Sequence, residues 1–180
     1  MLPQIVYYVS AYCDLVASGA VRMGETVNVC VPTGNFGNIL AAYYARCMGV
    51  PIRRLVCASN ANNVLTDFLT TGTYDRNRPF YQTASPSMDI LISSNLERLL
   101  YLLSGSDEAV RGYMAQLAET GRYTVSEEIK YAIQSVFSCG FCDDAGTEAM
   151  IGAEYKRSGY LLDTHTAVAY RVAEQFRRAD

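Results

Sequence analysis

The feature that most constrains this fold is an apolar run that ends in a turn containing two glycines and continues into a helix. Val27, Val29 and Val31 alternate along the run and are β-branched, which predicts a buried strand. Gly34 and Gly37 give the backbone freedom where the strand must turn sharply. The amides of such a turn and the positive end of the helix dipole favour a small anion, most often a phosphate group. The sequence therefore predicts a phosphate site at this turn.

The residues inside the turn narrow the kind of phosphate ligand. Asn35 and Asn38 are the candidate N-caps of the helix that follows, and Phe36 lies between them. The pattern is neither G-x-G-x-x-G nor a loop that ends in G-K-[ST], so a phosphate monoester is favoured over a dinucleotide or a nucleoside triphosphate. A tight strand-to-helix connection with no ligand explains the pattern equally well. The pattern alone leaves both interpretations open.

The order of the neighbouring elements predicts an α/β fold. A strand at 27–31, a helix at 36–48 and a strand at 52–58 form a βαβ unit, whose two strands should be parallel and joined by a right-handed crossover. Further helices are expected over residues 2–18, 62–72, 94–103, 107–119, 126–137, 143–156 and 163–176, with a long loop over 73–93. The Ser-x-x-Glu pattern at 94–97 has the form of a capping box. We expect one helix-rich domain over residues 1–180, a three-layer, Rossmann-like parallel-sheet architecture.

Composition excludes several functional classes. The net charge is −3 and the basic residues form no stripe, which argues against binding to nucleic acid. No apolar run approaches the ~20 residues of a membrane span, and no signal peptide is evident. The six cysteines fall mostly in predicted strands and helices, which favours a reducing compartment, the cytoplasm. Cys139 and Cys142 form a lone C-x-x-C that we interpret as two thiols in a connecting loop, and with one histidine in the chain no metal site is predicted.

Few residues offer reactive chemistry. His165 has the right side chain for a general base, but a single histidine without an obvious partner is more often a packed or capping residue. Thr166 can exchange a neutral hydrogen bond, and threonine before a helix is usually a cap. Lys130 and Lys156, the only lysines, lie among charged neighbours on predicted helices, whereas a nucleophilic lysine needs a setting that lowers its pKa. The residues alone therefore predict no catalytic group.

Several stretches, taken together, carry a family resemblance. They are residues 2–8, 33–38 (Thr-Gly-Asn-Phe-Gly-Asn), 58–65, 71–75, 85–90, 93–99 and 162–168. In this order they resemble threonine synthases of the longer bacterial and fungal type, which are fold type II enzymes dependent on pyridoxal phosphate. The resemblance covers nearly the whole chain, and the set is more specific than any single stretch. It implies the fold of such an enzyme, present here in an incomplete form.

The resemblance also assigns roles to residues. It implies that the cup for the cofactor phosphate is formed by Gly34, Asn35, Phe36, Gly37 and Asn38. Thr166 corresponds to the neutral hydroxyl partner of the pyridine nitrogen, and a hydroxyl leaves that nitrogen less protonated than a carboxylate would. Asn95 and Arg98 border the family's active site, so Arg98 is expected to meet the phosphate of the substrate, O-phosphohomoserine. The family's Asp-Pro-His-Thr appears at 163–166 as Asp-Thr-His-Thr, which mainly affects backbone stiffness before the helix.

The resemblance has gaps as well. The family's Schiff-base lysine lies in a segment ahead of the point where this chain begins, and no S-x-K-[DN] stretch here takes its place. We therefore expect this chain to be the middle part of the enzyme and to be inactive by itself. Its exposed faces could drive self-association. The complete enzyme would be a lyase that removes phosphate from O-phosphohomoserine by γ-elimination and adds water at the β carbon to give threonine.

Three other interpretations remain open at this point. A stand-alone module that binds a phosphate ligand without catalysis would share the same turn. A related type II enzyme such as a threonine dehydratase would share the turn and the hydroxyl, although the stretches at 85–89 and 93–98 argue against it. A redox module would instead use Cys139 and Cys142 and would need a low thiol pKa.

Overall fold

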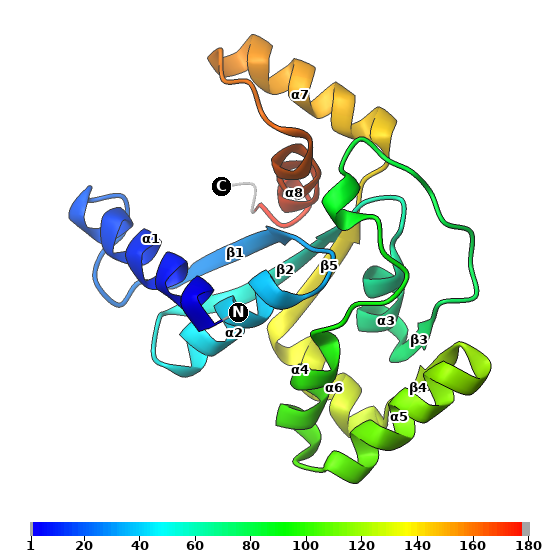
Figure 1. Cartoon of the computed structure of the whole chain (residues 1–180). Coiled ribbons are helices and arrows are strands. Elements are labelled where there is room, and N and C mark those ends of the chain that lie inside the picture. The colour runs from blue at the N-terminus through cyan, green and yellow to red at the C-terminus, as the bar shows by residue number, and fades with distance from the viewer. Residues whose placement is uncertain (1, 178–180) are drawn as a thin grey trace.

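A parallel three-stranded sheet forms the centre of the molecule, for which a computed structural model describes residues 2–177. The strands are β1 (Val27–Pro32), β2 (Ile52–Ser59) and β5 (Phe137–Phe141), in the order β1-β2-β5 (Figure 1). The first two strands are joined through α2 (Gly37–Cys47) and are parallel, which confirms the βαβ prediction. The remaining elements are η1 (Leu2–Gln4), α1 (Ile5–Ala17), α3 (Val64–Thr71), β3 (Thr73–Asp75), η2 (Pro86–Met88), α4 (Leu96–Ser104), α5 (Asp107–Thr120), β4 (Arg122–Thr124), α6 (Glu127–Val136), α7 (Asp144–Ser158) and α8 (Thr164–Glu174).

Helices cover both faces of this sheet, which confirms the three-layer α/β architecture. Leu55 and Cys57 of β2 point into a core shared with α2, α3 and α6. Val56 and Ala58 point the other way, into a smaller core with α8. Successive side chains of a strand face opposite sides, so β2 is apolar on both. This explains why its sequence is a continuous apolar run near its end.

The other helices extend these layers. In Figure 1, α1 packs beside α2, and α7 packs on α8 on the side away from the sheet. Helices α4 and α5 extend the main core beside α6, and α5 packs next to the small antiparallel sheet of β3 and β4. Among residues 2–177, no helix is long and apolar enough to cross a membrane, and no cluster of three metal-binding side chains occurs.

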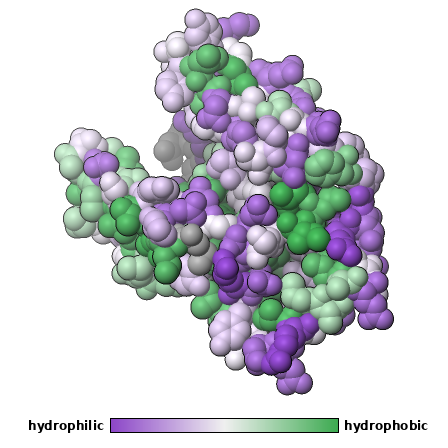
Figure 2. All heavy atoms as spheres, in the orientation of Figure 1, coloured by the Kyte–Doolittle hydropathy of each residue, from purple (hydrophilic) through white to green (hydrophobic). Residues whose placement is uncertain are grey.

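An apolar surface lies over η1 and the first turn of α1. Leu2, Val6 and Tyr7 have exposed fractions of 70%, 63% and 63%. Figure 2 shows hydrophobic side chains gathered over this helix, at the left of the view. Large apolar patches of this kind often mark contact surfaces.

The strand β5 corrects one sequence interpretation. Residues 137–141 were expected to be the end of a helix and a loop, but α6 runs directly into β5 without a turn residue between them. Cys139 packs against the larger core and Cys142 belongs to the smaller one, on the opposite face of the sheet. Burial raises the pKa of both thiols. The loop interpretation was therefore wrong for Cys139, which lies in β5, whereas Cys142 does lie in the connection between β5 and α7. The geometry of the pair does not suit a redox dithiol.

Phe137 should be a major source of stability, because its buried ring lies 5.7 Å from the ring of Phe36 and 5.8 Å from that of Tyr43. We expect Phe137→Ala to lower the free energy of unfolding by about 3–5 kcal/mol. Denaturant unfolding followed by circular dichroism measures this change. Tyr131→Ala is the control, since Tyr131 is 76% exposed on the adjoining helix. Equal losses for both variants would contradict this account of the core.

Candidate functional site

The turn between β1 and α2 lies at the carboxyl edge of the sheet, where ligands bind in open α/β folds. Its first residue, Thr33, is tied to the sheet by a hydrogen bond from its amide to the Ala58 carbonyl, 2.8 Å long. Phe36 then adopts a left-handed conformation with φ of 61°, and α2 begins at Gly37. Phe36 is the one non-glycine residue with positive φ in the part of the chain that the structure describes.

Phe36 holds this unfavourable conformation because its ring is anchored. The side chain is 1% exposed and packs against Phe137 in the main core. A left-handed conformation costs a non-glycine residue on the order of 1–3 kcal/mol, which the burial of a phenylalanine offsets. The backbone freedom predicted for Gly34 and Gly37 is thus used by Phe36 instead, since neither glycine has positive φ.

The carbonyl groups of the turn point to one side. Ser93 Oγ donates to the Gly34 carbonyl at 2.9 Å, and Asn95 Nδ2 donates to the Asn35 carbonyl at 2.7 Å. A trans peptide places its N–H opposite its C=O, so the amides of Asn35 and Phe36 point away from Ser93 and Asn95. Within residues 2–177, no protein acceptor takes the amide hydrogens of residues 34–38. The turn therefore presents a row of free donors.

A pocket of about 470 Å³ opens in front of this turn. It is lined by Gln4, Pro32, Thr33, Gly34, Asn35, Phe36, Gly37, Asn38, Ser87, Asn95 and Arg98. The structure thus brings together all five residues predicted for the cup and both residues predicted to border it. Free amides at the start of a helix, with no acidic side chain in the lining, suit a phosphate group.

Gly34 is required for the close approach of η2. A Cβ atom at this position would lie 2.7 Å from the Ser87 carbonyl oxygen, which is too short for any real contact. At Gly37 the corresponding atom would lie 3.3 Å from Asn95 Nδ2. The two glycines of the turn therefore serve packing between segments.

The asparagines of the turn do not cap α2, so that expectation was wrong. The residue before the helix is Phe36, and no side chain accepts a hydrogen bond from the first amides. Asn38 Oδ1 instead accepts a hydrogen bond from the Tyr8 hydroxyl, 2.6 Å long. Burial raises the pKa of Tyr8 to about 12, so this hydroxyl keeps its hydrogen at neutral pH. The uncapped start of α2 leaves its amides to a ligand.

Asn95 and Arg98 lie at the start of α4. The capping box expected at 94–97 is absent, because α4 begins after Asn95 and no side chain caps it. Asn95 uses its amide nitrogen to hold the Asn35 carbonyl and its oxygen to accept a hydrogen bond from the Arg98 guanidinium. Arg98 makes no ion pair with any of residues 2–177, so its charge remains available at the pocket.

Thr166 does not line the pocket. It is exposed in the first turn of α8, and its hydroxyl donates a hydrogen bond to the Asp163 carboxylate. The next residue toward the N-terminus, His165, accepts a hydrogen bond from the Ser87 amide at Nε2, 3.2 Å long. Ser87 also forms the wall against Gly34, so the start of α8 adjoins the cup.

Sequence reasoning did not identify the residues that shape this wall. Asp89 Oδ1 accepts hydrogen bonds from Asn60 Nδ2 at 2.7 Å and from Asn62 Nδ2 at 3.0 Å, which fixes the segment carrying η2 against the end of β2. The segment was predicted to be a loop and has no periodicity. The family resemblance of residues 58–65 and 85–90 was the only signal that these segments contribute to the site. The hydrogen bonds between the two segments were not predicted.

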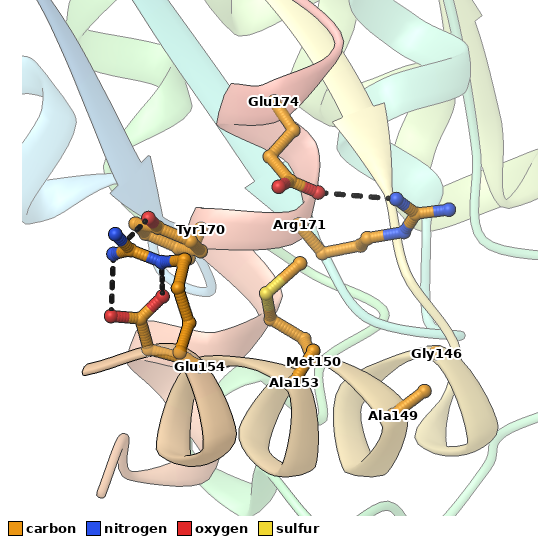
Figure 3. A pocket seen from close by; sticks show the side chains of 9 residues that line it. Gly146, Ala149, Met150, Ala153, Glu154, Tyr170, Arg171 and Glu174 are labelled. Carbon is orange, nitrogen blue, oxygen red and sulfur yellow. Dashed lines mark hydrogen bonds and ion pairs between the residues drawn. The ribbon is translucent and has the colours of Figure 1, made fainter. Parts of the chain in front are cut away.

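A second pocket, of about 370 Å³, lies between α7 and α8 (Figure 3). Its charged groups are already paired, with 2.7 Å between Arg157 and Glu154 and 3.2 Å between Arg171 and Glu174. Met150 lies between these pairs. The pocket offers no row of free donors comparable to the turn after β1.

Neither lysine lies near the candidate site. Lys130 on α6 packs against Gly72 and pairs with Glu127 at 3.4 Å. Lys156 is exposed on α7. The pocket in front of the turn has no lysine among its lining residues.

The contact between Gly34 and Ser87 can be tested by substitution. Gly34→Ala should lower the free energy of unfolding by about 1–3 kcal/mol, because η2 must move to admit the new methyl group. The control is Gly112→Ala, within α5, where a Cβ atom meets nothing within 4 Å. That change should raise stability by about 0.5–1 kcal/mol. Thermal unfolding of both variants checks the prediction, and a neutral Gly34→Ala would contradict it.

Comparisons with known proteins identify relatives over almost the entire chain. No family model matches. A human protein named threonine synthase-like 1 is 49% identical over 177 residues, which covers 97% of this chain and 24% of that protein. The threonine synthase of Pseudomonas aeruginosa is 38% identical over 180 residues, covering 99% of this chain and 37% of that enzyme.

Solved structures give the same result. The structure of threonine synthase from Brucella melitensis, described as bound to PLP, is 44% identical with a TM-score of 0.90, over 99% of this chain and 37% of that one. Yeast threonine synthase is 34% identical with a TM-score of 0.89, over 96% of this chain and 36% of that one. This chain therefore spans from about a quarter to about two fifths of the relatives that it matches. Its sequence and fold make this chain a relative of the threonine synthases, which confirms the resemblance seen in the sequence.

Proposed function

We propose that this chain forms the phosphate-binding part of a pyridoxal-phosphate site in a threonine synthase that acts on O-phosphohomoserine. The observation that carries the proposal is the row of free amides at residues 34–38, which faces a pocket at the carboxyl edge of the sheet. The relatives support it, because one solved structure is described as a PLP-bound threonine synthase. We further propose that residues 1–180 act as one domain.

The residues around the turn fit the cofactor's phosphate. The free amides donate to the phosphate oxygens, and the dipole of α2 stabilises their negative charge. Gly34 lets η2 close one side of the pocket, and the Tyr8 hydroxyl holds the side chain of Asn38. Thr166, in the first turn of α8, is the proposed partner of the ring nitrogen. When bound, the cofactor supplies an electron sink for removal of protons from the substrate and for loss of its phosphate.

Arg98 is the proposed group for the substrate's phosphate. Its guanidinium is exposed at the pocket and held by Asn95, which is itself fixed to the turn through the Asn35 carbonyl. A guanidinium binds phosphate through two parallel, charge-assisted hydrogen bonds. This arrangement would place the leaving group beside the cofactor site and would stabilise the charge that it carries away.

We propose that the chain alone does not catalyse this lyase reaction. Lys130 and Lys156 lie on α6 and α7, away from the pocket, and Lys130 is paired with Glu127. The covalent amine would then come from residues outside this sequence. The free cysteines suit the cytoplasm that we propose as its compartment. The apolar surface of η1 and α1, defined by Leu2, Val6 and Tyr7, would favour self-association.

The phosphate site predicts a specific ligand preference. Pyridoxine 5′-phosphate should bind at least about tenfold more tightly than pyridoxine, because only the phosphate ester meets the free amides, and tenfold corresponds to 1.4 kcal/mol. Isothermal titration calorimetry with each compound measures the difference. Gly34→Ala should remove the preference, while Gly112→Ala should keep it.

The outcome also separates the alternative functions. Equal affinity for the two compounds would refute the phosphate cup. Preference for the phosphate ester together with threonine formation by the chain alone would refute the proposed need for an outside amine. Tight binding of the phosphate ester by a chain that stays monomeric, without a partner to cover its apolar surface, would favour a stand-alone binding module.

The role of Arg98 is tested separately. Arg98→Ala should weaken binding of O-phosphohomoserine by about tenfold or more and leave pyridoxine 5′-phosphate affinity within about twofold, since each charge-assisted hydrogen bond contributes about 1.5–3 kcal/mol. Arg111→Ala is the control, because Arg111 is an exposed arginine of α5 paired with Asp107. Competition titrations at two salt concentrations measure both affinities. If Arg98→Ala weakened binding of pyridoxine 5′-phosphate and not of O-phosphohomoserine, Arg98 would be assigned to the cofactor's phosphate instead.

A further inference from the structure

Gln4 brings a side-chain carboxamide to the pocket in front of the turn. It is the last residue of η1 and directly precedes α1, and its half-buried side chain is part of the pocket lining. A Cβ atom added at Gly37 would lie 3.8 Å from Gln4 Oε1, which places the carboxamide beside the first residue of α2. The side chain therefore reaches the end of the turn that carries the free amides.

The local structure of α1 does not account for this orientation. Gln4 occupies the N-cap position, where serine, threonine, aspartate and asparagine are favoured because their short side chains bond the first amides of a helix. The Gln4 side chain makes no such bond, and it has no hydrogen-bond partner among residues 2–177. Its amide group is thus left available to a ligand in the pocket.

Tyr8 fixes the position of this segment over the start of α2. It follows Gln4 by four residues, a spacing that brings two side chains to the same side of a helix. The Tyr8 hydroxyl donates to Asn38 Oδ1, and α1 packs beside α2 (Figure 1). Gln4 and Tyr8 therefore lie beside consecutive residues of α2, Gly37 and Asn38.

A phosphate group at the turn needs more donors than one row of amides supplies. It carries three strong acceptor oxygens, and the amides approach it from the turn alone. The pocket lining holds one formal charge, the Arg98 guanidinium, and no carboxylate. A carboxamide N–H can donate to a further phosphate oxygen without adding a charge to the site.

We propose that Gln4 is a further ligand of the phosphate group, donating a hydrogen bond from Nε2 and closing the cup from the side of α1. The inference rests on the proposed function, because it needs a phosphate at the free amides. The last torsion of a glutamine side chain is broad and roughly two-fold, so the unpaired carboxamide turns Nε2 toward an entering anion at little cost. The cup then takes its donors from two segments, the turn after β1 and η1.

Two substitutions separate this hydrogen bond from the shape of the side chain. Gln4→Met keeps the length and removes the donor, and it should weaken binding of pyridoxine 5′-phosphate about tenfold, the loss expected for one hydrogen bond to a charged group. Gln4→Glu keeps the shape but places an acceptor-only carboxylate against the phosphate, so its loss should be larger. Both variants should bind pyridoxine, which has no phosphate, within about twofold of the wild type.

Isothermal titration calorimetry of the full 180-residue chain measures these affinities. Gln116→Glu is the matched control, because Gln116 is exposed on α5 and does not line the pocket. It adds the same charge to the chain and should leave both affinities within about twofold of the wild type.

Direct contact is measured by NMR of the side-chain amide protons in the ¹⁵N-labelled chain. The Gln4 signals are identified by their loss in Gln4→Met. They should shift downfield when pyridoxine 5′-phosphate is added and stay in place with pyridoxine, because only the phosphate ester accepts a charge-assisted hydrogen bond. The Gln116 signals should not move with either compound. A residue that only supports the fold would not give this pattern.

The outcomes distinguish this inference from the proposed function. A wild type that does not prefer the phosphate ester over pyridoxine would overturn the phosphate cup and this inference with it. A preference that Gln4→Met and Gln4→Glu leave unchanged, with unshifted Gln4 amide protons, would overturn the role of Gln4 alone. Equal losses for the two compounds, or an equal loss in Gln116→Glu, would also refute a bond from Gln4 to the phosphate. A loss confined to the phosphate ester, together with the amide shift, supports both.

Discussion

The hydrogen bonds that Ser93 and Asn95 donate to the carbonyls of the turn are the interaction on which the candidate site depends. They fix the peptide planes after β1, and the amides on the opposite side are left for a ligand as a direct consequence. The same two residues begin the segment that leads to Arg98. The proposed sites for two phosphate groups are therefore shaped by one short segment packed against one turn.

The sequence predicts the central architecture well because the strongest signals are local. The alternation at Val27, Val29 and Val31 and the apolar run of β2 identify two strands, and the helix between them requires a parallel pairing. β5 was missed because α6 continues into it without a glycine or proline boundary, and its five residues are too few to show a period. A strand is recognised in a sequence by its length and by the boundary residues around it, and β5 has neither signal.

The sequence predicts which residues of the turn come together, but it does not predict what holds them there. The five residues of the turn do line one pocket, yet the residue with positive φ is Phe36, whose ring is held by Phe137 about a hundred residues later. The wall formed by Ser87 and the bonds from Asn60 to Asp89 also join distant segments. Such contacts depend on tertiary packing, which overrides local preference and leaves no periodic trace.

The buried ring of Phe36 links the binding turn to the folding of the whole domain. Its left-handed backbone is held in place by the core, so the donors keep their direction only while that core is packed. A ligand that binds this turn must therefore bind the native state alone, and its free energy of binding adds to that of folding. The melting temperature of the chain would then report how fully the turn is occupied by ligand. A substitution in the distant core would lower the ligand's affinity without changing any group that contacts the ligand.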